Sequence, residues 1–278
     1  MRLARYRSNG TVHFGVIEGD AIRPVADAQS IAEAAAEAHD SSQEPLRLAD
    51  VALDSPVFPL VRNPFCVGWN YVDHFAEGAA ARGSGGAQEL PDRPTFFTKA
   101  TTSIIGPFDP VASHAAVTQT LDWEVELAVV IGAGGADIPE ERALDAILGF
   151  CVANDVTARN VQRGHGGQWF RGKSLDGTSP IGPWVVTPDE IGELGPRAIT
   201  CRVNGETVQS ATLADLHFGV SRIIAELSAG LTLLPGDVIL TGTPSGVGFA
   251  RTPPRYLRAG DVVESEIDGI GVLRNEVA

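Results

Sequence analysis

The 278-residue sequence contains no apolar run long enough to cross a membrane as a helix. Its first residues, Met1 to Arg7, include three arginines and no apolar core, so no secretory signal peptide is expected. The three cysteines are far apart and form no Cys-x-x-Cys pair, which argues against disulfides and a zinc site and indicates reduced, buried thiols. We therefore expect a cytoplasmic protein.

Positive charge is also scarce. The 21 Lys and Arg residues face 35 Asp and Glu residues, and the formal net charge is −14. Such a surface repels nucleic acid and anionic membranes, so neither is expected as a main partner. An anionic small molecule is not excluded, because a metal ion and a few lysines can reverse the sign of the potential inside a pocket. The composition, 44% hydrophobic and 20% charged, is that of a folded chain with a core.

The length fits one large domain, or a main domain with a small addition. Near the N-terminus, residues 18–20 (Glu-Gly-Asp) separate two strand-like segments and predict a hairpin. Residues 30–33 (Ser-Ile-Ala-Glu) predict the capped start of an alanine-rich helix, and the polar residues 40–45 suggest a linker. We predict a small N-terminal α/β domain over residues 1–60 and a larger β-rich domain over residues 61–278.

Short apolar segments separated by Gly and Pro predict the strands of the larger domain. The clearest strands cover residues 64–68, 123–131, 149–154, 184–187 and 238–241. The Asn-Gly dipeptide at 204–205 and the Asp-Gly dipeptide at 268–269 predict two hairpins. Helices are predicted at 139–148, with a proline in the first turn, and at 213–229, which ends at Gly230. The predicted fold class is α+β, predominantly β.

The strongest chemical signal lies in residues 121–131 (LDWEVELAVVI). Strand alternation places Asp122, Glu124 and Glu126 on one face, and the apolar continuation indicates a buried strand. Neighbouring buried carboxylates repel each other and lose hydration unless a cation lies between them. Mg²⁺, Mn²⁺ and Ca²⁺ prefer such oxygen ligands. The alternation alone is equally consistent with a half-exposed strand whose glutamates face solvent.

A third carboxylate is available at Asp155, which directly follows the apolar residues 149–154. An acidic group at the tip of a buried strand is well placed to face a pocket. Three carboxylates would leave about half of an octahedral coordination shell for water and substrate, as metal catalysis requires. Glu124, Glu126 and Asp155 are therefore candidate ligands of one divalent metal ion.

Four blocks of the sequence resemble the fumarylacetoacetate hydrolase (FAH) family. The blocks are DWEVELAVVIG at 122–132, NDVTARNVQ at 154–162, GKS at 172–174 and TGTPSGVG at 241–248. They occur in the family's order with similar separations, and the likeness covers roughly residues 60–278. The resemblance implies a mixed β-roll or barrel-like catalytic domain, usually a homodimer. It also implies that Glu124, Glu126 and Asp155 hold Mg²⁺ or Mn²⁺, with Ca²⁺ as a possible substitute in a crystal.

His74 and Glu77 are three residues apart and lie side by side if their segment is helical. A carboxylate beside an imidazole raises the pKa of the imidazole and fixes its tautomer, so the pair can deprotonate a water molecule. An ordinary surface helix would show the same spacing. The glycine-rich residues 82–86 would let the segment close over a pocket, and the segment resembles the family's lid, whose His and Glu activate water.

Five further polar residues are candidates for contact with the substrate. Lys173 matches the family's Gly-Lys-Ser element and would offset charge on an enolate or carboxylate, although most lysines lie on the surface. Lys99 resembles another active-site lysine of the family. Arg159 and Gln162, one helical turn apart, could orient a carboxylate and a carbonyl. Thr243 lies in a glycine-rich turn whose N–H groups could bind an anionic end, or which could be only structural.

Together these features predict a metal-dependent enzyme that forms an enolate from a small 2-oxo acid. We expect a hydrolase of the acylpyruvase-like branch. It would cleave a C–C bond of a β-diketo or 2,4-dioxo acid, such as an acylpyruvate or fumarylpyruvate, with water activated by His74 and Glu77. The product would be pyruvate or a related 2-oxo acid, in the catabolism of aromatic or sugar acids.

Two alternatives to this hydrolase stay open. The same site could decarboxylate oxaloacetate, or tautomerise, isomerise or decarboxylate a 2-oxo-enedioate. A non-catalytic metabolite-binding protein is a lesser alternative. Two departures from the family pattern leave the substrate open: Asn160 stands where many relatives have an acid, and residues 175–178 (Leu-Asp-Gly-Thr) differ from the commoner order after the lysine.

Overall fold

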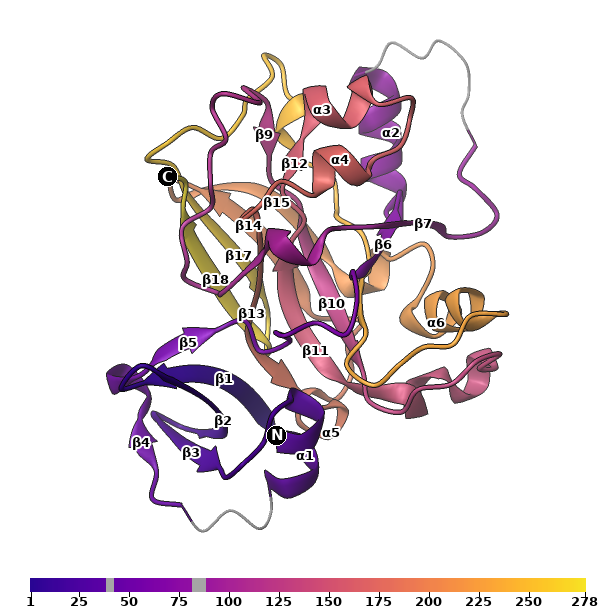
Figure 1. Cartoon of the computed structure of the whole chain (residues 1–278). Coiled ribbons are helices and arrows are strands. Elements are labelled where there is room, and N and C mark those ends of the chain that lie inside the picture. The colour runs from indigo at the N-terminus through magenta and orange to yellow at the C-terminus, as the bar shows by residue number, and fades with distance from the viewer. Residues whose placement is uncertain (39–42, 82–88) are drawn as a thin grey trace.

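The computed structural model describes residues 1–38, 43–81 and 89–278 (Figure 1). Part of the predicted linker at 40–45 and the whole glycine-rich segment at 82–86 lie outside the described residues. The fold is α+β and predominantly β, as predicted from the sequence. Within the described part of the chain, no helix is long and apolar enough to cross a membrane.

The N-terminal segment forms a small layer of strands covered by one helix (Figure 1). The predicted hairpin and helix are both confirmed, and the Ser30 Oγ accepts a hydrogen bond from the Glu33 N–H at 3.2 Å. The Glu33 carboxylate accepts from Gln29, so the predicted capping box is only half formed. The elements are β1 (Arg2–Ser8), β2 (Thr11–Glu18), β3 (Ala21–Val25), α1 (Ile31–Glu37), β4 (Leu46–Arg47), η2 (Leu48–Asp50) and β5 (Ala52–Asp54).

This layer continues into the main sheet, because β1 pairs antiparallel with β13 and Leu3 lies opposite Val185. The sheet has 12 strands, and its main path runs β4-β3-β2-β1-β13-β11-β10-β16-β6-β7. The central strand β10 is buried along its whole length, which explains its unbroken apolar sequence. The remaining strands are β6 (Phe65–Gly68), β7 (Thr95–Thr98), β8 (Ile104–Ile105), β10 (Val125–Ile131), β11 (Ile147–Asn154), β13 (Ser179–Val186) and β16 (Val238–Leu240).

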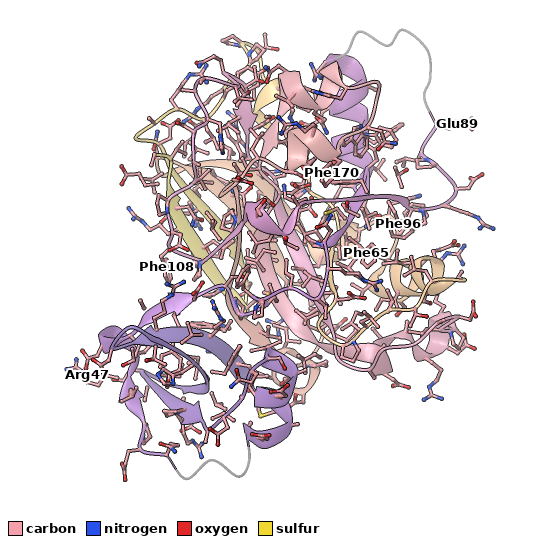
Figure 2. All side chains as sticks on the ribbon, in the orientation of Figure 1. Arg47, Phe65, Glu89, Phe96, Phe108 and Phe170 are labelled. Atoms are coloured by element: carbon pink, nitrogen blue, oxygen red, sulfur yellow. The ribbon has the colours of Figure 1, made fainter. Side chains whose placement is uncertain are left out.

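A second sheet of four strands, in the order β15-β14-β17-β18, packs against the first. Both predicted hairpins are confirmed here. Asn204 and Gly205 adopt the positive φ angles that a two-residue turn requires, +53° and +80°. Apolar side chains of both sheets form one shared core. Figure 2 draws the described side chains on the ribbon. The strands are β14 (Ala198–Val203), β15 (Glu206–Thr212), β17 (Val262–Ile267) and β18 (Gly271–Glu276).

Both helix predictions for the larger domain are wrong in part. Residues 139–148 form the 3₁₀ helix η4 (Glu140–Ala146), and the chain then enters β11, where Ile147 pairs with Ile131. Residues 213–229 split into η5 (Leu213–Asp215) and α6 (Val220–Ser228). The break arises at His217 and Phe218, because both of their N–H groups donate to Asn70. The His217 N–H donates to the Asn70 carbonyl at 2.8 Å, and the Phe218 N–H donates to the Asn70 side chain at 2.7 Å.

Three helices gather at one end of the central sheet, together with the short pair β9–β12 (Figure 1). This end of the sheet carries the polar residues described next. The remaining elements are α2 (Val72–Ala81), η3 (Thr101–Ser103), β9 (Leu121–Asp122), β12 (Thr157–Ala158), α3 (Arg159–Gly164), α4 (Phe170–Lys173), α5 (Pro188–Ile191) and η6 (Gly248–Ala250).

Candidate active site

The site begins at an interruption of the predicted strand at 123–131. The strand β10 starts only at Val125, and two side chains satisfy the backbone N–H groups at the break. The Glu124 N–H donates to Asn154 Oδ1 at 2.9 Å, and the Val125 N–H donates to Gln209 Oε1 at 3.0 Å. Strand pairing is therefore replaced locally by side-chain acceptors, which frees this edge to present carboxylates to a cavity.

The structure brings together the three predicted metal ligands, called here the acidic trio: Glu124, Glu126 and Asp155. All three are buried, and each offers an oxygen within 4.8 Å of the others. Glu126 comes from β10, whereas Asp155 follows the neighbouring strand β11. The Asp155 N–H donates to the Glu124 carbonyl at 2.8 Å, which fixes the two side chains near each other.

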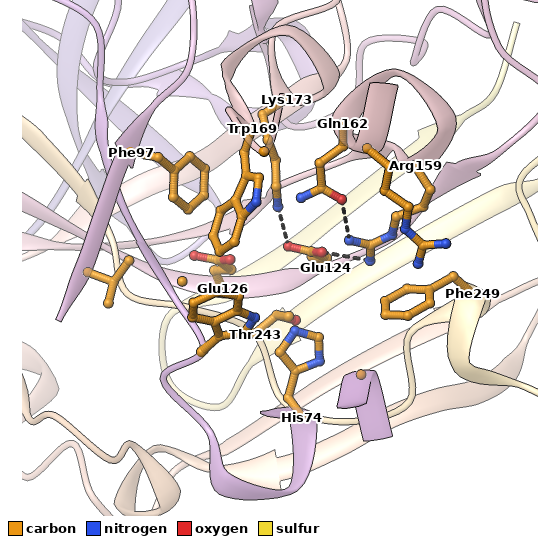
Figure 3. A pocket seen from close by; sticks show the side chains of 16 residues that line it. His74, Phe97, Glu124, Glu126, Arg159, Gln162, Trp169, Lys173, Thr243 and Phe249 are labelled. Atoms are coloured by element: carbon orange, nitrogen blue, oxygen red, sulfur yellow. Dashed lines mark hydrogen bonds and ion pairs between the residues drawn. The ribbon is translucent and has the colours of Figure 1, made fainter. Parts of the chain in front are cut away.

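Three buried cations surround the acidic trio, and Figure 3 shows two of them, Lys173 and Arg159, beside Glu124. The Lys173 Nζ lies 2.6 Å from Glu124 Oε2 and 2.6 Å from Asp155 Oδ2. Arg159 Nη2 lies 2.7 Å from Glu124 Oε1. Lys99 Nζ donates to Asp155 Oδ1 at 2.5 Å. Lys99 is fully buried behind Asp155 and is not among the described residues that line the cavity, so its position favours charge compensation over substrate contact.

These neighbours divide the acidic trio into two kinds of carboxylate. Burial alone would raise the pKa of Glu124, but the charges of Lys173 and Arg159 outweigh burial and lower the pKa to about 2. Burial raises the pKa of Glu126 well above its ordinary value, and the charges of Asp155 and Glu124 raise it further. Without a metal, Glu126 therefore holds a proton over a wider pH range than a free glutamate does.

This environment suits a divalent metal ion. The donors are carboxylate oxygens, which hard cations such as Mg²⁺ and Mn²⁺ prefer. Gly242 donates its N–H to Glu126 Oε2 at 2.7 Å, whereas Glu126 Oε1 accepts no hydrogen bond from the described residues. A cation at this point would replace the proton of Glu126 and remove the repulsion within the acidic trio. The residues fit the predicted ion, and its identity stays a prediction.

His74 and Glu77 lie on the helix α2, one turn apart, as predicted. The His74 Nδ1 lies 2.9 Å from Glu77 Oε1, and Glu77 Oε2 accepts a hydrogen bond from the Gly246 N–H at 2.9 Å. His74 lines the cavity and approaches the carboxylates from the side opposite Lys173 (Figure 3). Glu77 thus connects α2 to the glycine-rich turn at 241–248 and holds the imidazole in place.

The glycine-rich turn differs from its predicted role. Its N–H groups do bind anions, but these anions are carboxylates of the protein itself: Gly242 donates to Glu126, Gly246 to Glu77 and Gly248 to Asp122. Thr243 lines the cavity, and its hydroxyl donates to the Val125 carbonyl at 2.9 Å. Those three N–H groups are therefore not available to a substrate, whereas the Thr243 side chain faces the cavity and its contact with a substrate stays a prediction.

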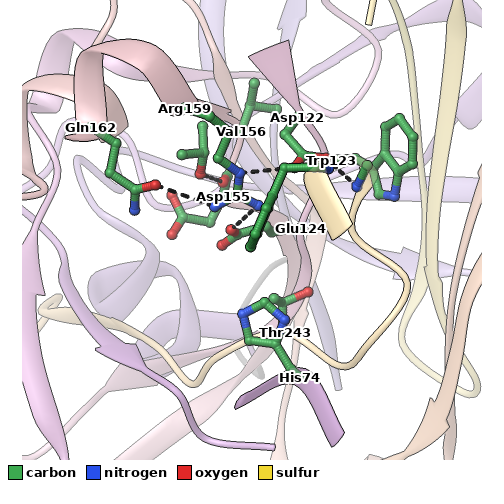
Figure 4. Close-up of polar contacts among 12 residues, drawn as sticks. His74, Asp122, Trp123, Glu124, Asp155, Val156, Arg159, Gln162 and Thr243 are labelled. Carbon is green, nitrogen blue, oxygen red and sulfur yellow. Dashed lines mark hydrogen bonds and ion pairs between the residues drawn. The ribbon is translucent and has the colours of Figure 1, made fainter. Parts of the chain in front are cut away.

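Asp122 is a residue whose role the sequence did not indicate, although strand alternation placed it on the same face as Glu124. It is fully buried and accepts a hydrogen bond from Arg159 Nε at 2.8 Å and from the N–H groups of Gly248 and Phe249 (Figure 4). Its carboxylate is therefore occupied by the protein and positions Arg159. The other nearby predicted residue, Gln162, accepts from Arg159 Nη1 at 3.4 Å.

The cavity beside these groups has a volume of about 280 Å³ and an aromatic wall. Trp169 packs edge-on against Trp69, with ring centroids 4.8 Å apart, and against Phe97 at 5.2 Å. Phe249 closes the side near Arg159 (Figure 3). The sequence could not show that these residues form one wall, because aromatic residues far apart in the chain carry no periodic signal.

Gly172 sets the distance between the helices α3 and α4. A Cβ atom on Gly172 would lie 2.4 Å from the Cα and N atoms of Gln162, so backbone would have to move. We expect Gly172→Ala to destabilise the fold by about 2 kcal/mol through overpacking. Thermal unfolding would measure this, with Gly164→Ala as the control because no atom lies within 4 Å of the added methyl. Equal melting temperatures for the two variants would contradict the expected clash.

The chain is similar to known proteins over its whole length. The family of fumarylacetoacetate (FAA) hydrolase C-terminal domains matches residues 63–278, and the Rv2993c-like N-terminal family matches residues 1–56. Oxaloacetate tautomerase YisK from Bacillus subtilis (strain 168) is 42% identical over 263 residues, which make up 94% of this chain and 84% of that protein.

Two solved structures resemble the whole chain. A fumarylacetoacetate hydrolase (EaFAH) from psychrophilic Exiguobacterium antarcticum has a TM-score of 0.86 and 41% identity, covering 100% of this chain and 99% of that one. A 5-carboxymethyl-2-hydroxymuconate delta-isomerase from Mycobacterium smegmatis has a TM-score of 0.80 and 35% identity, with the same coverage. The ordered sequence blocks, the fold and these matches show that the chain belongs to the fumarylacetoacetate hydrolase family.

Proposed function

We propose that the protein is a divalent-metal-dependent enzyme that interconverts the keto and enol forms of a short 2-oxo dicarboxylic acid such as oxaloacetate. The observation that carries this proposal is the position of His74, whose ring faces the cavity while its Nδ1 is engaged by Glu77. Keto–enol conversion needs a base at C3 and a positive environment at the C2 oxygen. His74 and Lys173 supply these two requirements from opposite sides of the cavity.

The proton would move as follows. The Nδ1–H of His74 donates to Glu77, which leaves Nε2 as the base. The C3 proton moves to Nε2, the C–H electron pair forms the C2–C3 double bond, and negative charge develops on the C2 oxygen. Lys173 offsets this charge, and return of the proton to the oxygen completes the enol. The reverse sequence regenerates the keto form.

The acidic trio would hold the metal ion. When bound there, the ion would polarise the 2-oxo group and make the neighbouring C–H more acidic. The cavity volume of about 280 Å³ favours a small substrate, because sites for larger ligands commonly reach several hundred Å³. The names of the relatives, an oxaloacetate tautomerase and a muconate isomerase, favour this chemistry over the hydrolysis expected from the sequence.

The proposal is tested by diluting the enol form of oxaloacetate into buffer and following the decay of its ultraviolet absorbance. With Mg²⁺ or Mn²⁺ we expect the purified protein to accelerate this decay, and chelation with EDTA to remove the effect. Replacing His74 by glutamine should lower the rate by about 100- to 10,000-fold, as for loss of a general base, while metal affinity stays unchanged. No acceleration by the wild type would refute the proposal.

A second candidate is hydrolysis of an acylpyruvate, which the His74–Glu77 pair favours because it could equally deprotonate a water molecule. Pyruvate release from an acylpyruvate, measured in a coupled assay, distinguishes the two activities. Pyruvate release from oxaloacetate in the same assay would identify decarboxylation. The homodimer, the cytoplasmic location, the domain boundary near residue 60 and the preference for Mg²⁺ or Mn²⁺ remain predictions.

A further inference from the structure

The acidic trio and the four charged residues around it, called here the inner site, can neutralise only a limited number of substrate carboxylates. Four buried carboxylates face three buried cations, so the cluster carries one net negative charge when all seven groups are charged: Asp122, Glu124, Glu126, Asp155, Lys99, Arg159 and Lys173. A divalent cation changes this to one net positive charge. The inner site can therefore balance one carboxylate of a substrate, and a second carboxylate needs another cation.

Arg163 is the remaining arginine or lysine that lines the cavity. It follows Arg159 by four residues on α3 and therefore lies on the same face of the helix. Arg159 and Lys173 are both paired with carboxylates, whereas Arg163 has no acidic partner among the residues that the structure describes. Its side chain is exposed at the cavity rim, where an incoming anion can reach it.

The ring of Phe249 packs against the guanidinium groups of both Arg159 and Arg163. Its ring centroid lies 4.5 Å from Arg159 Cζ and 4.8 Å from Arg163 Cζ. A guanidinium group stacked on a ring keeps its N–H groups free for a carboxylate, and stacking reduces the conformational entropy lost on binding. The Phe249 N–H donates to Asp122 at 3.0 Å, so the ring belongs to the same fixed network as Arg159.

We propose that Arg163 binds the second carboxylate of the substrate and thereby selects dicarboxylic over monocarboxylic 2-oxo acids. This inference rests on the proposed function for the identity of the substrate, and it adds the residue that distinguishes oxaloacetate from pyruvate. The first carboxylate and the 2-oxo group lie at the acidic trio. The second carboxylate lies at the rim, between Arg163 and the edge of Phe249.

The test compares the binding of oxaloacetate and pyruvate to the Mg²⁺-loaded protein. Trp69 and Trp169 line the cavity, so stopped-flow tryptophan fluorescence can follow binding before oxaloacetate decays. We expect Arg163→Gln to weaken oxaloacetate binding by about tenfold, the loss of one charge-assisted contact at an exposed site, and to change pyruvate binding by less than about twofold. Arg163→Lys should restore part of the affinity, because it keeps the charge but loses the planar fork.

Arg171→Gln is the matched control. Arg171 is also an exposed arginine, lies on the neighbouring helix α4, and is not among the cavity-lining residues. This variant should bind both acids as the wild type does. Equal weakening of pyruvate and oxaloacetate by Arg163→Gln, or the same loss in Arg171→Gln, would overturn the proposal, because either result would indicate a general effect of charge.

The two proposals fail in different ways. If the wild type binds oxaloacetate but does not accelerate its tautomerisation, the proposed function fails, and selective weakening by Arg163→Gln still supports the role of Arg163. If tautomerisation is accelerated but Arg163→Gln leaves the KM for oxaloacetate unchanged, the role of Arg163 fails alone. An increase in KM with nearly unchanged kcat is the expected kinetic result, because Arg163 would contact the second carboxylate and not the C3 proton or the C2 oxygen.

Discussion

Replacing Glu126 by glutamine should lower the rate of oxaloacetate tautomerisation by at least about a thousandfold, because the acidic trio loses a charged ligand and the 2-oxo group loses its metal ion. Glutamine has nearly the same shape and can still accept the Gly242 hydrogen bond, so the fold should persist. Enol decay would measure the rate, and calorimetric titration with Mn²⁺ would measure the metal affinity.

The control for this variant is Glu141→Gln. Glu141 is an exposed glutamate in η4, and it does not line the cavity. Glu141→Gln removes the same charge as Glu126→Gln but away from the cavity, so this variant should retain the metal affinity and the rate of the wild type. Full activity of Glu126→Gln would show that the acidic trio does not hold a catalytic metal ion.

Glu126→Gln should also remove part of the pH dependence of the unfolding free energy. Burial, followed by the charges of Asp155 and Glu124, raises the pKa of Glu126 well above 4.5 in the metal-free protein. The folded state holds this proton more tightly than the unfolded chain, so its stabilisation is complete below about pH 4.5 and is lost as the pH rises through the raised pKa. As the pH rises above about 4.5, metal-free Glu126→Gln should therefore lose less stability than the wild type.

Urea unfolding at several pH values, in the presence of EDTA, would measure this difference. Glu124 should show the opposite behaviour, because its pKa is lowered to about 2 in the folded state. Its ionised carboxylate stabilises the fold above about pH 4.5, and this stabilisation is lost as the pH falls toward 2. Adding Mg²⁺ should restore the stability that the wild type loses at high pH. Identical pH profiles for the wild type and Glu126→Gln would contradict the assignment.

The second large effect is expected for Lys173→Met. Lys173 is almost fully buried and is paired with both Glu124 and Asp155 at 2.6 Å, so removing its charge leaves two buried carboxylates without their shared cation. We expect the metal-free variant to lose about 3 kcal/mol of unfolding free energy. Added Mg²⁺ should restore most of this loss but not the enzymatic rate, because the C2 oxygen would still lack its cation.

Lys99→Met is the matched comparison, since Lys99 is equally buried and pairs with Asp155 but does not line the cavity. It should destabilise the metal-free protein similarly, yet lose much less activity once Mg²⁺ is added. Unfolding in EDTA and in Mg²⁺, together with enol decay, separates the two effects. If metal-free Lys173→Met were as stable as the wild type, the ion pairs seen here would contribute nothing to stability.

Local sequence signals predicted all three hairpins and most of the named strands, because the turn residues and the alternating pattern act over only a few positions. The strand predicted at 184–187 is only the end of β13 (Ser179–Val186). Alternation also placed Glu124 and Glu126 on one face, although it missed the break before Val125. That break depends on Asn154 and Gln209, which come from other strands. The predicted helix at 213–229 failed for the same kind of reason, since Asn70 is distant in the sequence.

The site shows the same limit. The family resemblance indicated His74, Glu77 and Lys173, and the structure brings these residues to one cavity or its rim. The resemblance could not indicate that the N–H groups of the glycine-rich turn bind the protein's own carboxylates, because the direction of these N–H groups depends on tertiary contacts. Arg163 and Phe249 were also missed, since their relation appears only when residues 86 positions apart meet across the cavity.

The two halves of the site come from separate parts of the chain. Six of the seven groups in the charged cluster lie between residues 122 and 173, whereas the imidazole comes from α2 and is attached to the rest by the Glu77–Gly246 hydrogen bond. Reaction type and metal affinity can therefore diverge independently during evolution. A descendant could acquire a different proton carrier on α2 and inherit the ion-binding half unchanged, which makes this helix the natural segment to exchange when new activities are engineered.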